Sequence, residues 1–331
     1  MNIRKALALT LVCYLLFLIV YLMLELLKPF NIRENAEVYI PKGASFSTIA
    51  SIFKEKGFIR NETVFKIAGR ALGIEKKARA GYYLITPEMN LVDLLYKLLE
   101  GKILDYSFTV VEGDSIFEIA EKLSKLNPDY SSKFLELSTK KEFLKSLNID
   151  APSLEGYLYP ATYSIPKGME IEEIVTMMVR KFWSVYDEAL INKTKELGWT
   201  VNQVVTLASI IEKEAKLEEE KPIISAVYHN RLKLGMPLQA DPTAIYGIKR
   251  YREGVTKKDL QNRTPYNTYI IKGLPPGPIA SPSLTSIKAA LNPAKVPYLY
   301  FVARGDGSHE FSVNYDRHVS VINELRGNKS E

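Results

Sequence analysis

The chain has 331 residues, 47% apolar and 25% charged, which is enough for two or three folded units with real cores. Its net charge of +6 comes from 44 basic and 38 acidic residues in clusters of both signs, an arrangement that argues against a nucleic-acid-binding track. The single cysteine, Cys13, excludes an internal disulfide framework. The three histidines, His229, His309 and His318, lack the His-Glu-x-x-His spacing of a zinc hydrolase, and we interpret them as core or surface residues.

Residues 6–24, ALALTLVCYLLFLIVYLML, form an uncharged apolar run. As a helix, this run spans roughly 28 Å at about 1.5 Å per residue, close to the hydrocarbon thickness of a bilayer. It is longer than the apolar core of a signal peptide, and ELLKPFNIREN after it offers no small-x-small cleavage site. Since Arg4 and Lys5 precede the run, residues 1–30 are predicted to be a single-pass anchor in the cytoplasmic membrane, with the N-terminus cytoplasmic and the remaining chain extracytoplasmic.

A strand, a tight Gly or Pro turn and an amphipathic helix recur along the chain, clearly at 39–53 and 109–123 and more loosely at 83–98 and 163–178. Ser45 and Ser115 occupy the expected N-cap positions of the two clearer helices. One such unit alone is common in many folds. The clearer units resemble LysM-type modules, small βααβ units associated with binding N-acetylglucosamine-containing glycans. This resemblance predicts a LysM-like region at 36–104 and a second LysM-like pattern at 109–123.

The stretch TLASIIEKEAKLEEE predicts a helix that carries two glutamates of interest. Its apolar stripe is made by Val204, Leu207, Ala208, Ile211 and Ala215. Glu212 and Glu214 flank the stripe on either side, so both can reach a boundary between core and cleft. Periodicity alone does not choose between them, and Glu218, Glu219 and Glu220 look like a solvated run.

Polar and aromatic side chains gather on short rigid turns between residues 237 and 279. Sugar-binding sites use this mixture, because aromatic faces cover sugar rings while amides, hydroxyls and carboxylates bind their hydroxyl and N-acetyl groups. Core tyrosines and ordinary turn chemistry would explain each motif singly. The candidates for glycan binding are Gln239, Asp241, Thr243, Tyr266, Asn267, Thr268 and Tyr269. Residues 297–318 read as a β-hairpin closed by a Gly-Asp-Gly turn.

Five phrases occur in a fixed order: LEGYLYP, ASIIEKEA, NRLKLGMPLQADPTAIYG, PYNTY and GLPPGPIASP. Together they resemble the YceG-like endolytic murein transglycosylases (the MltG type), over essentially residues 1–325. The resemblance implies an α+β fold, with a catalytic region at 105–328 whose core, about 150–328, is distantly similar to lysozyme-like transglycosylases. It also implies that Glu214 is the catalytic acid. Relatives commonly carry Thr, Ser or Gly after this glutamate, and Ala215 leaves the orienting role of a hydroxyl there in doubt.

The implied reaction needs one carboxyl group, whereas ordinary glycoside hydrolases use two. Glu214 would protonate the oxygen between N-acetylmuramic acid and N-acetylglucosamine, then take the proton of the muramoyl 6-hydroxyl, leaving a 1,6-anhydro end. This role needs a raised pKa, which desolvation provides. Glu212 and the seven turn residues are candidates for glycan binding or for orienting the acid.

No metal or organic cofactor is implied. The expected partners are peptidoglycan glycan strands, the membrane and a peptidoglycan synthase complex, and no nucleic acid is expected. Two alternatives stay open: a hydrolytic muramidase, which needs the same acid, and an inactive membrane-anchored glycan-binding scaffold.

Overall fold

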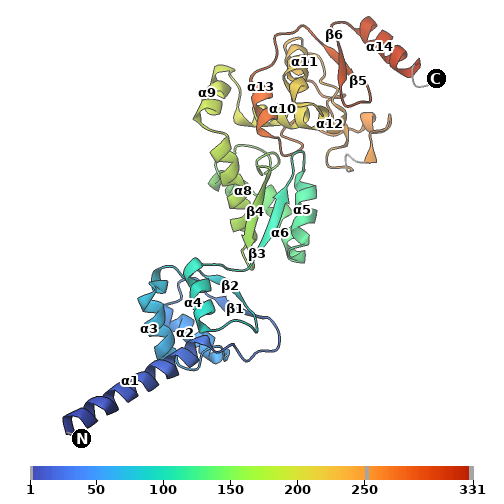
Figure 1. Cartoon of the computed structure of the whole chain (residues 1–331). Helices are drawn as coiled ribbons and strands as arrows, with labels where there is room; N and C mark the ends of the chain where they lie inside the picture. The colour runs from blue at the N-terminus through green and yellow to red at the C-terminus, as the bar shows by residue number, and fades with distance from the viewer. Residues whose placement is uncertain (1–2, 250–252, 328–331) are drawn as a thin grey trace. The chain divides into compact units, whose positions relative to one another are not determined.

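The computed structural model describes residues 3–249 and 253–327. The chain divides into two compact units: Met1–Tyr106 with Ser164–Met169 (unit 1), and Ser107–Tyr163 with Glu170–Glu331 (unit 2). Helices dominate both, and the described strands form three two-stranded sheets, so the predicted α+β class is confirmed (Figure 1). The outermost ends of the predicted first and last segments, residues 1–2 and 328, lie outside the described residues.

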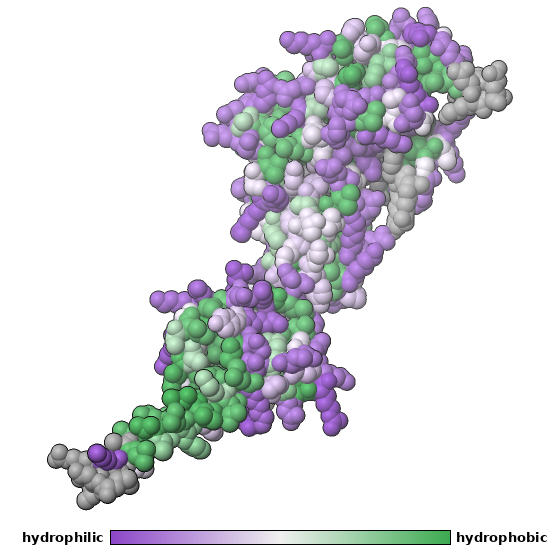
Figure 2. Space-filling view, viewed as in Figure 1, coloured by the Kyte–Doolittle hydropathy of each residue, from purple (hydrophilic) through white to green (hydrophobic). Residues whose placement is uncertain are grey.

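Helix α1 (Ile3–Leu27) contains the whole predicted apolar run 6–24. Residues Leu9–Leu27 have a mean hydropathy of 2.4 and are not buried inside the protein. Figure 2 shows the hydrophobic surface that results along α1. The helix is therefore long and apolar enough to cross a membrane.

Unit 1 follows α1 with β1 (Ala36–Ile40), α2 (Phe46–Glu55), α3 (Glu62–Ala71), the 3₁₀ helix η1 (Ile74–Lys76), β2 (Gly81–Ile85) and α4 (Leu91–Glu100). Strands β1 and β2 pair antiparallel, from Ala36 opposite Ile85 to Ile40 opposite Gly81. Alternate residues of both strands are buried against the aromatic side chains of α2 and α3. The core of unit 1 is thus made by the inward face of the β1–β2 strand pair and the apolar stripes of the unit 1 helices.

Unit 2 begins with β3 (Asp105–Val110), α5 (Ile116–Ser124), α6 (Pro128–Ser138), α7 (Lys141–Ser146), β4 (Ala161–Pro166) and α8 (Ile171–Val185), and the unit border falls inside β3 and β4, which pair with each other. All four predicted strand–turn–helix units are therefore confirmed. Ser45 and Ser115 accept hydrogen bonds from the N3 backbone N–H of their helices, as expected for N-caps. Gly43 and Gly113 have φ values of 75° and 80°, which explains glycine at both turns.

The remaining elements of unit 2 are α9 (Glu188–Glu196), α10 (Val201–Glu214), η2 (Glu218–Glu220), α11 (Lys221–Lys233), α12 (Asp241–Ile245), η4 (Asp259–Gln261), α13 (Leu284–Leu291), β5 (Tyr300–Ala303), β6 (His309–Ser312) and α14 (Tyr315–Gly327). Helix α10 lies at the centre of this region, packed against α13 and α11, and every residue from Val204 to Ile211 is buried (Figure 1). Strands β5 and β6 form the predicted hairpin. Because α10 is fixed along most of its length, its C-terminal end is a rigid platform for the glutamates.

Candidate active site

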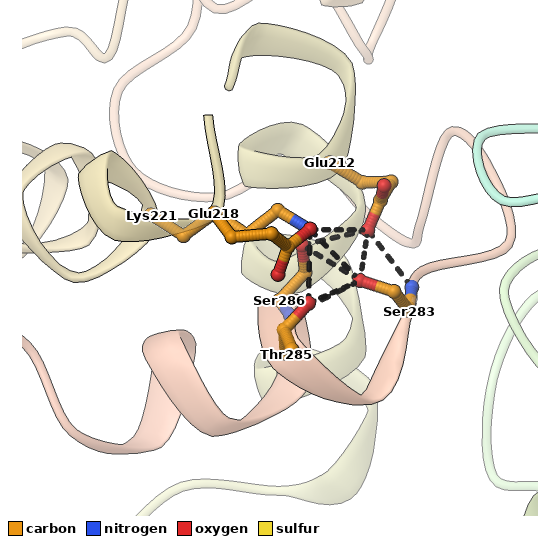
Figure 3. Close-up of polar contacts among 6 residues, drawn as sticks. All are labelled: Glu212, Glu218, Lys221, Ser283, Thr285 and Ser286. Atoms are coloured by element: carbon orange, nitrogen blue, oxygen red, sulfur yellow. Dashed lines mark hydrogen bonds and ion pairs between the residues drawn. The ribbon is translucent and has the colours of Figure 1, made fainter. Parts of the chain in front are cut away.

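Glu212 is held inside unit 2 by a dense set of hydrogen-bond donors (Figure 3). Its Oε2 accepts the Ser283 backbone N–H at 2.9 Å, the Ser283 hydroxyl at 2.5 Å and the Ser286 hydroxyl at 2.7 Å. The Lys221 ammonium lies 3.4 Å from the same oxygen. The Glu212 and Lys221 side chains are only 9% and 3% exposed. Glu212 therefore links α10 to α11 and α13 through Oε2, which is already contacted by four donor groups.

Lys221 has a second acidic partner in Glu218, at 2.6 Å, and its Nζ also donates to the Ser283 and Thr285 hydroxyls. Glu218 and Glu219 are exposed, as predicted for a solvated run. The same prediction is wrong for Glu220, which is 8% exposed. Its burial has a physical cause, because both carboxylate oxygens accept hydrogen bonds from His309.

Glu214 is the last residue of α10 and lies in different surroundings. Helix α10 ends here because Ala215 takes an extended conformation. The Glu214 side chain lines a pocket of about 250 Å³, which we call the acid pocket. The pocket is lined by Glu214, Arg231, Leu238, Gln239, Asp241, Tyr269, Phe301, Val302, Ala303 and His309.

Burial raises the pKa of Glu214 to about 8, and the neighbouring Asp241 carboxylate acts in the same direction. The Tyr228 hydroxyl and the Asp241 backbone N–H act in the opposite direction and do not outweigh burial. Glu214 is consequently protonated at neutral pH. A neutral carboxylic acid at the wall of an open pocket can donate its proton to a bound ligand.

Asp241, Tyr269 and Gln239, three of the predicted binding residues, share the acid pocket with Glu214. The Tyr269 hydroxyl donates to Asp241 Oδ1 at 2.6 Å. Gln239 has a positive φ of 52°, and its side-chain oxygen accepts from Arg231 at 3.2 Å. The strained Gln239 backbone turns its side chain into the pocket rim, where the amide nitrogen makes no hydrogen bond within the described chain.

Thr243, Asn267 and Thr268 are completely buried and do not line the acid pocket. The two threonine hydroxyls lie 2.8 Å apart, and Thr268 also accepts the Ala240 backbone N–H at 2.9 Å. Asn267 donates to two backbone carbonyls, those of Leu260 and Asn262. The threonine bonds hold Ala240 and α12 against the PYNTY loop, beside Asp241 and Tyr269, and the Asn267 bonds hold the same loop against residues 260–262.

Tyr266 belongs to a different part of unit 2. Its ring lies 4.6 Å from that of Tyr246, whose hydroxyl donates to the buried Glu155 at 2.8 Å. Burial raises the pKa of Glu155 to about 8, although the Ile116 backbone N–H donates to it. Tyr246 lines a second cavity, of about 380 Å³, together with Phe117 and Ile248 among others. The structure therefore separates Tyr266 from the acid pocket.

Comparison with known proteins shows which family the chain belongs to. The YceG-like family model matches residues 38–324. The chain belongs to the YceG-like family. An endolytic murein transglycosylase of Bacillus subtilis (strain 168) is 35% identical over 319 residues, covering 90% of this chain and 87% of the relative. An endolytic murein transglycosylase of Streptococcus pneumoniae (strain ATCC BAA-255 / R6) is 30% identical over 307 residues, covering 82% of this chain and 55% of the relative.

A crystal structure of a YceG-like protein from Listeria monocytogenes, at 2.6 Å, aligns with this chain with a TM-score of 0.60. The two chains are 32% identical, and the alignment covers 87% of this chain and 99% of the other. The recognition of the YceG-like family from five ordered motifs is thus confirmed.

Two polar residues of this YceG-like pocket, Arg231 and His309, were not among the candidates from the sequence. Arg231 is buried, donates to the Leu299 and Leu238 carbonyls, and lies 5.1 Å from the centre of the Tyr300 ring. His309 was interpreted as an ordinary core or surface residue, whereas it lines the acid pocket. No spacing signal could have found it, because its partner Glu220 is 89 positions away.

Proposed function

We propose that this protein is an endolytic murein transglycosylase that cuts nascent peptidoglycan strands between N-acetylmuramic acid and N-acetylglucosamine and so ends their elongation. The observation that carries the proposal is Glu214, a carboxyl with a pKa of about 8 at the wall of an open pocket. The membership of the YceG-like family and the relatives named endolytic murein transglycosylase support it.

The reaction would begin with proton transfer from Glu214 to the glycosidic oxygen. The bond between this oxygen and muramoyl C1 breaks, and the substrate's N-acetyl group stabilises the positive charge that develops at C1. Glu214, now ionised, takes the proton of the muramoyl 6-hydroxyl, whose oxygen closes on C1. The products are a 1,6-anhydro end and a free N-acetylglucosamine end, and Glu214 is again protonated. General acid catalysis of this kind typically contributes about 10²–10⁴-fold.

Glu212 takes no part in this scheme as a proton donor, because its Oε2 is bound by Lys221 and two serines. Asp241 and Tyr269 would contact the glycan or orient the acid, since both line the acid pocket. Gln239 offers its amide at the pocket rim. Thr243, Asn267 and Thr268 would act through the loops that they hold together, and Tyr266 is proposed for a glycan contact away from the acid.

Helix α1 would anchor the protein in the cytoplasmic membrane with its N-terminus inside and both units outside, a topology supported by its apolar length and by Arg4 and Lys5 before the apolar run. Unit 1 would help to hold the glycan as a LysM-like module, a proposal supported by its β1-α2-α3-β2 order. Insoluble peptidoglycan should then retain residues 36–104 made as a separate fragment. A peptidoglycan synthase complex is the partner that we infer for an enzyme that ends strand elongation.

Product chemistry in ¹⁸O-labelled water tests the proposal against a hydrolytic muramidase. The full chain in detergent micelles would be given uncrosslinked glycan strands, and the new ends analysed by mass spectrometry. A transglycosylase forms anhydro ends without ¹⁸O, because no water enters the product. Reducing ends that carry ¹⁸O would make the protein a muramidase, and strands left uncut would favour the inactive scaffold.

A further inference from the structure

His309 is the first residue of β6 and lies in the wall of the acid pocket, across the β5–β6 hairpin from Ala303. Its neighbour in strand β5, Phe301, lines the same pocket and meets the imidazole ring edge to face, with ring centres 5.3 Å apart. The hairpin therefore carries an ionisable ring to the pocket that contains Glu214.

Glu220 holds His309 at two points. Glu220 Oε1 accepts the His309 backbone N–H at 2.9 Å, and Glu220 Oε2 lies 2.6 Å from His309 Nδ1. The two side chains are only 7% and 10% exposed, so water competes little for these contacts. Because a carboxylate can only accept, Nδ1 carries the hydrogen that points at Glu220. This arrangement fixes both the tautomer and the direction of the ring.

The remaining ring nitrogen, Nε2, forms no hydrogen bond within the described part of the chain. With Nδ1 bound to Glu220, Nε2 is the ring nitrogen that can hydrogen-bond a ligand. Two charged groups of the pocket already have partners within the protein. Arg231 donates to backbone carbonyls and to Gln239, and Asp241 accepts the Tyr269 hydroxyl. Nε2 is thus an oriented hydrogen-bonding atom without a partner in the described part of the chain, on a residue that lines the pocket of Glu214.

We propose that His309 is a substrate-contacting residue of the Glu214 site, whose Nε2 forms a hydrogen bond with a sugar hydroxyl of the glycan, and that Glu220 is its positioning residue. Sugar hydroxyls can donate or accept a hydrogen bond, so a fixed imidazole nitrogen in the pocket wall selects one placement of the sugar ring against the acid. This inference rests on the proposed function, since it takes the occupant of the acid pocket to be a glycan strand.

Two substitutions separate contact with the glycan from a merely structural role. His309→Asn keeps an amide near the position of Nδ1, and so retains the link to Glu220, but has no atom at the position of Nε2. In His309→Gln, the side-chain amide reaches the position of Nε2, but the hydrogen bond to Glu220 is lost. Loss of one such hydrogen bond should raise KM and lower kcat/KM about 10-fold in His309→Asn. His309→Gln should recover part of this loss.

The measurements use the full chain in detergent micelles with uncrosslinked glycan strands. Glycan binding is measured as well, in a Glu214→Gln background with and without His309→Asn, and should weaken about 10-fold. If His309→Asn matches the parent protein in both assays, or only His309→Gln is impaired, His309 acts through Glu220 alone and the inference is wrong. If the parent protein cuts no strand to anhydro ends, the proposed function is what fails, and the binding assay still tests His309.

A second readout leaves the imidazole intact and so does not depend on the variants folding. In ¹⁵N-histidine spectra of the Glu214→Gln protein, the glycan should shift one Nε2 resonance, that of His309. His229 serves as an internal control, because its Nε2 is already 2.9 Å from the Ala290 carbonyl oxygen and it does not line the pocket. Spectra in which a saturating glycan shifts no Nε2 resonance would overturn the inference.

Discussion

Replacing Glu212 by Gln should destabilise unit 2 while leaving the acid in place. The substitution keeps an oxygen that can accept from Ser283 and Ser286, but it removes the charge that faces the buried Lys221 ammonium at 3.4 Å. Breaking a buried ion pair from one side costs about 3–5 kcal/mol. Because Lys221 keeps Glu218 at 2.6 Å and two hydroxyl acceptors, we expect a smaller loss, about 2–3 kcal/mol.

Tryptophan fluorescence during urea unfolding measures this loss, since both tryptophans of the chain, Trp183 and Trp199, belong to unit 2. The matched control is Glu214→Gln, which removes no ion pair and should not lower the free energy of unfolding of unit 2. At urea concentrations below its unfolding midpoint, the Glu212→Gln protein should cut glycan strands at a rate within about 10-fold of wild type. We expect this because the proposed acid, Glu214, remains intact. Two results would refute the assignment of a structural role to Glu212 and the acid role to Glu214. One is unchanged stability of Glu212→Gln, and the other is a stable Glu212→Gln protein without activity.

Three further predictions concern Glu214, Tyr269 and Gly69. The proposed acid, Glu214, must be protonated to act, and its pKa is about 8. The value of kcat/KM should therefore be constant below pH 8 and fall about 10-fold per pH unit above it. The Glu212→Gln protein should show the same fall at alkaline pH. Tyr269→Phe removes the hydroxyl that donates to Asp241 at 2.6 Å, so kcat should fall about 10-fold while urea unfolding changes by less than about 1.5 kcal/mol. Gly69→Ala would place Cβ 2.1 Å from the Phe46 ring, so far-UV circular dichroism should report unit 1 destabilised by about 1–3 kcal/mol, with the tryptophan transition of unit 2 unmoved.

Local elements could be predicted from the sequence because their causes are local. Ser45 and Ser115 cap the helices that directly follow them, and Gly43 and Gly113 supply the positive φ of the turns between strand and helix. The pairing of the strands is a different matter. Thr109 and Thr162 lie side by side in β3 and β4, with 53 positions between them, and nothing in either segment specifies the other.

Helical periodicity could not distinguish Glu212 from Glu214, because the groups that surround each side chain lie elsewhere in the chain. Glu212 is bound by Ser283, 71 positions away, while Glu214 faces Asp241 in an open pocket. The run of three glutamates misled the prediction for Glu220 in the same way. Its burial depends on His309, which arrives from a hairpin that looks unrelated in the sequence. The resemblance to the family implies that Glu214 is the acid, and its raised pKa in the wall of the acid pocket is the physical reason for proposing it.

The most direct test of the central claim is the rate at which Glu214→Gln protein forms anhydro-muramoyl ends on uncrosslinked glycan strands. The Gln side chain has nearly the same shape and cannot donate a carboxylic proton, so no anhydro product should appear while the tryptophan unfolding transition keeps at least its wild-type stability. Cleavage by Glu214→Gln at the wild-type rate would contradict the assignment of Glu214 as the acid, whatever the behaviour of Glu212→Gln.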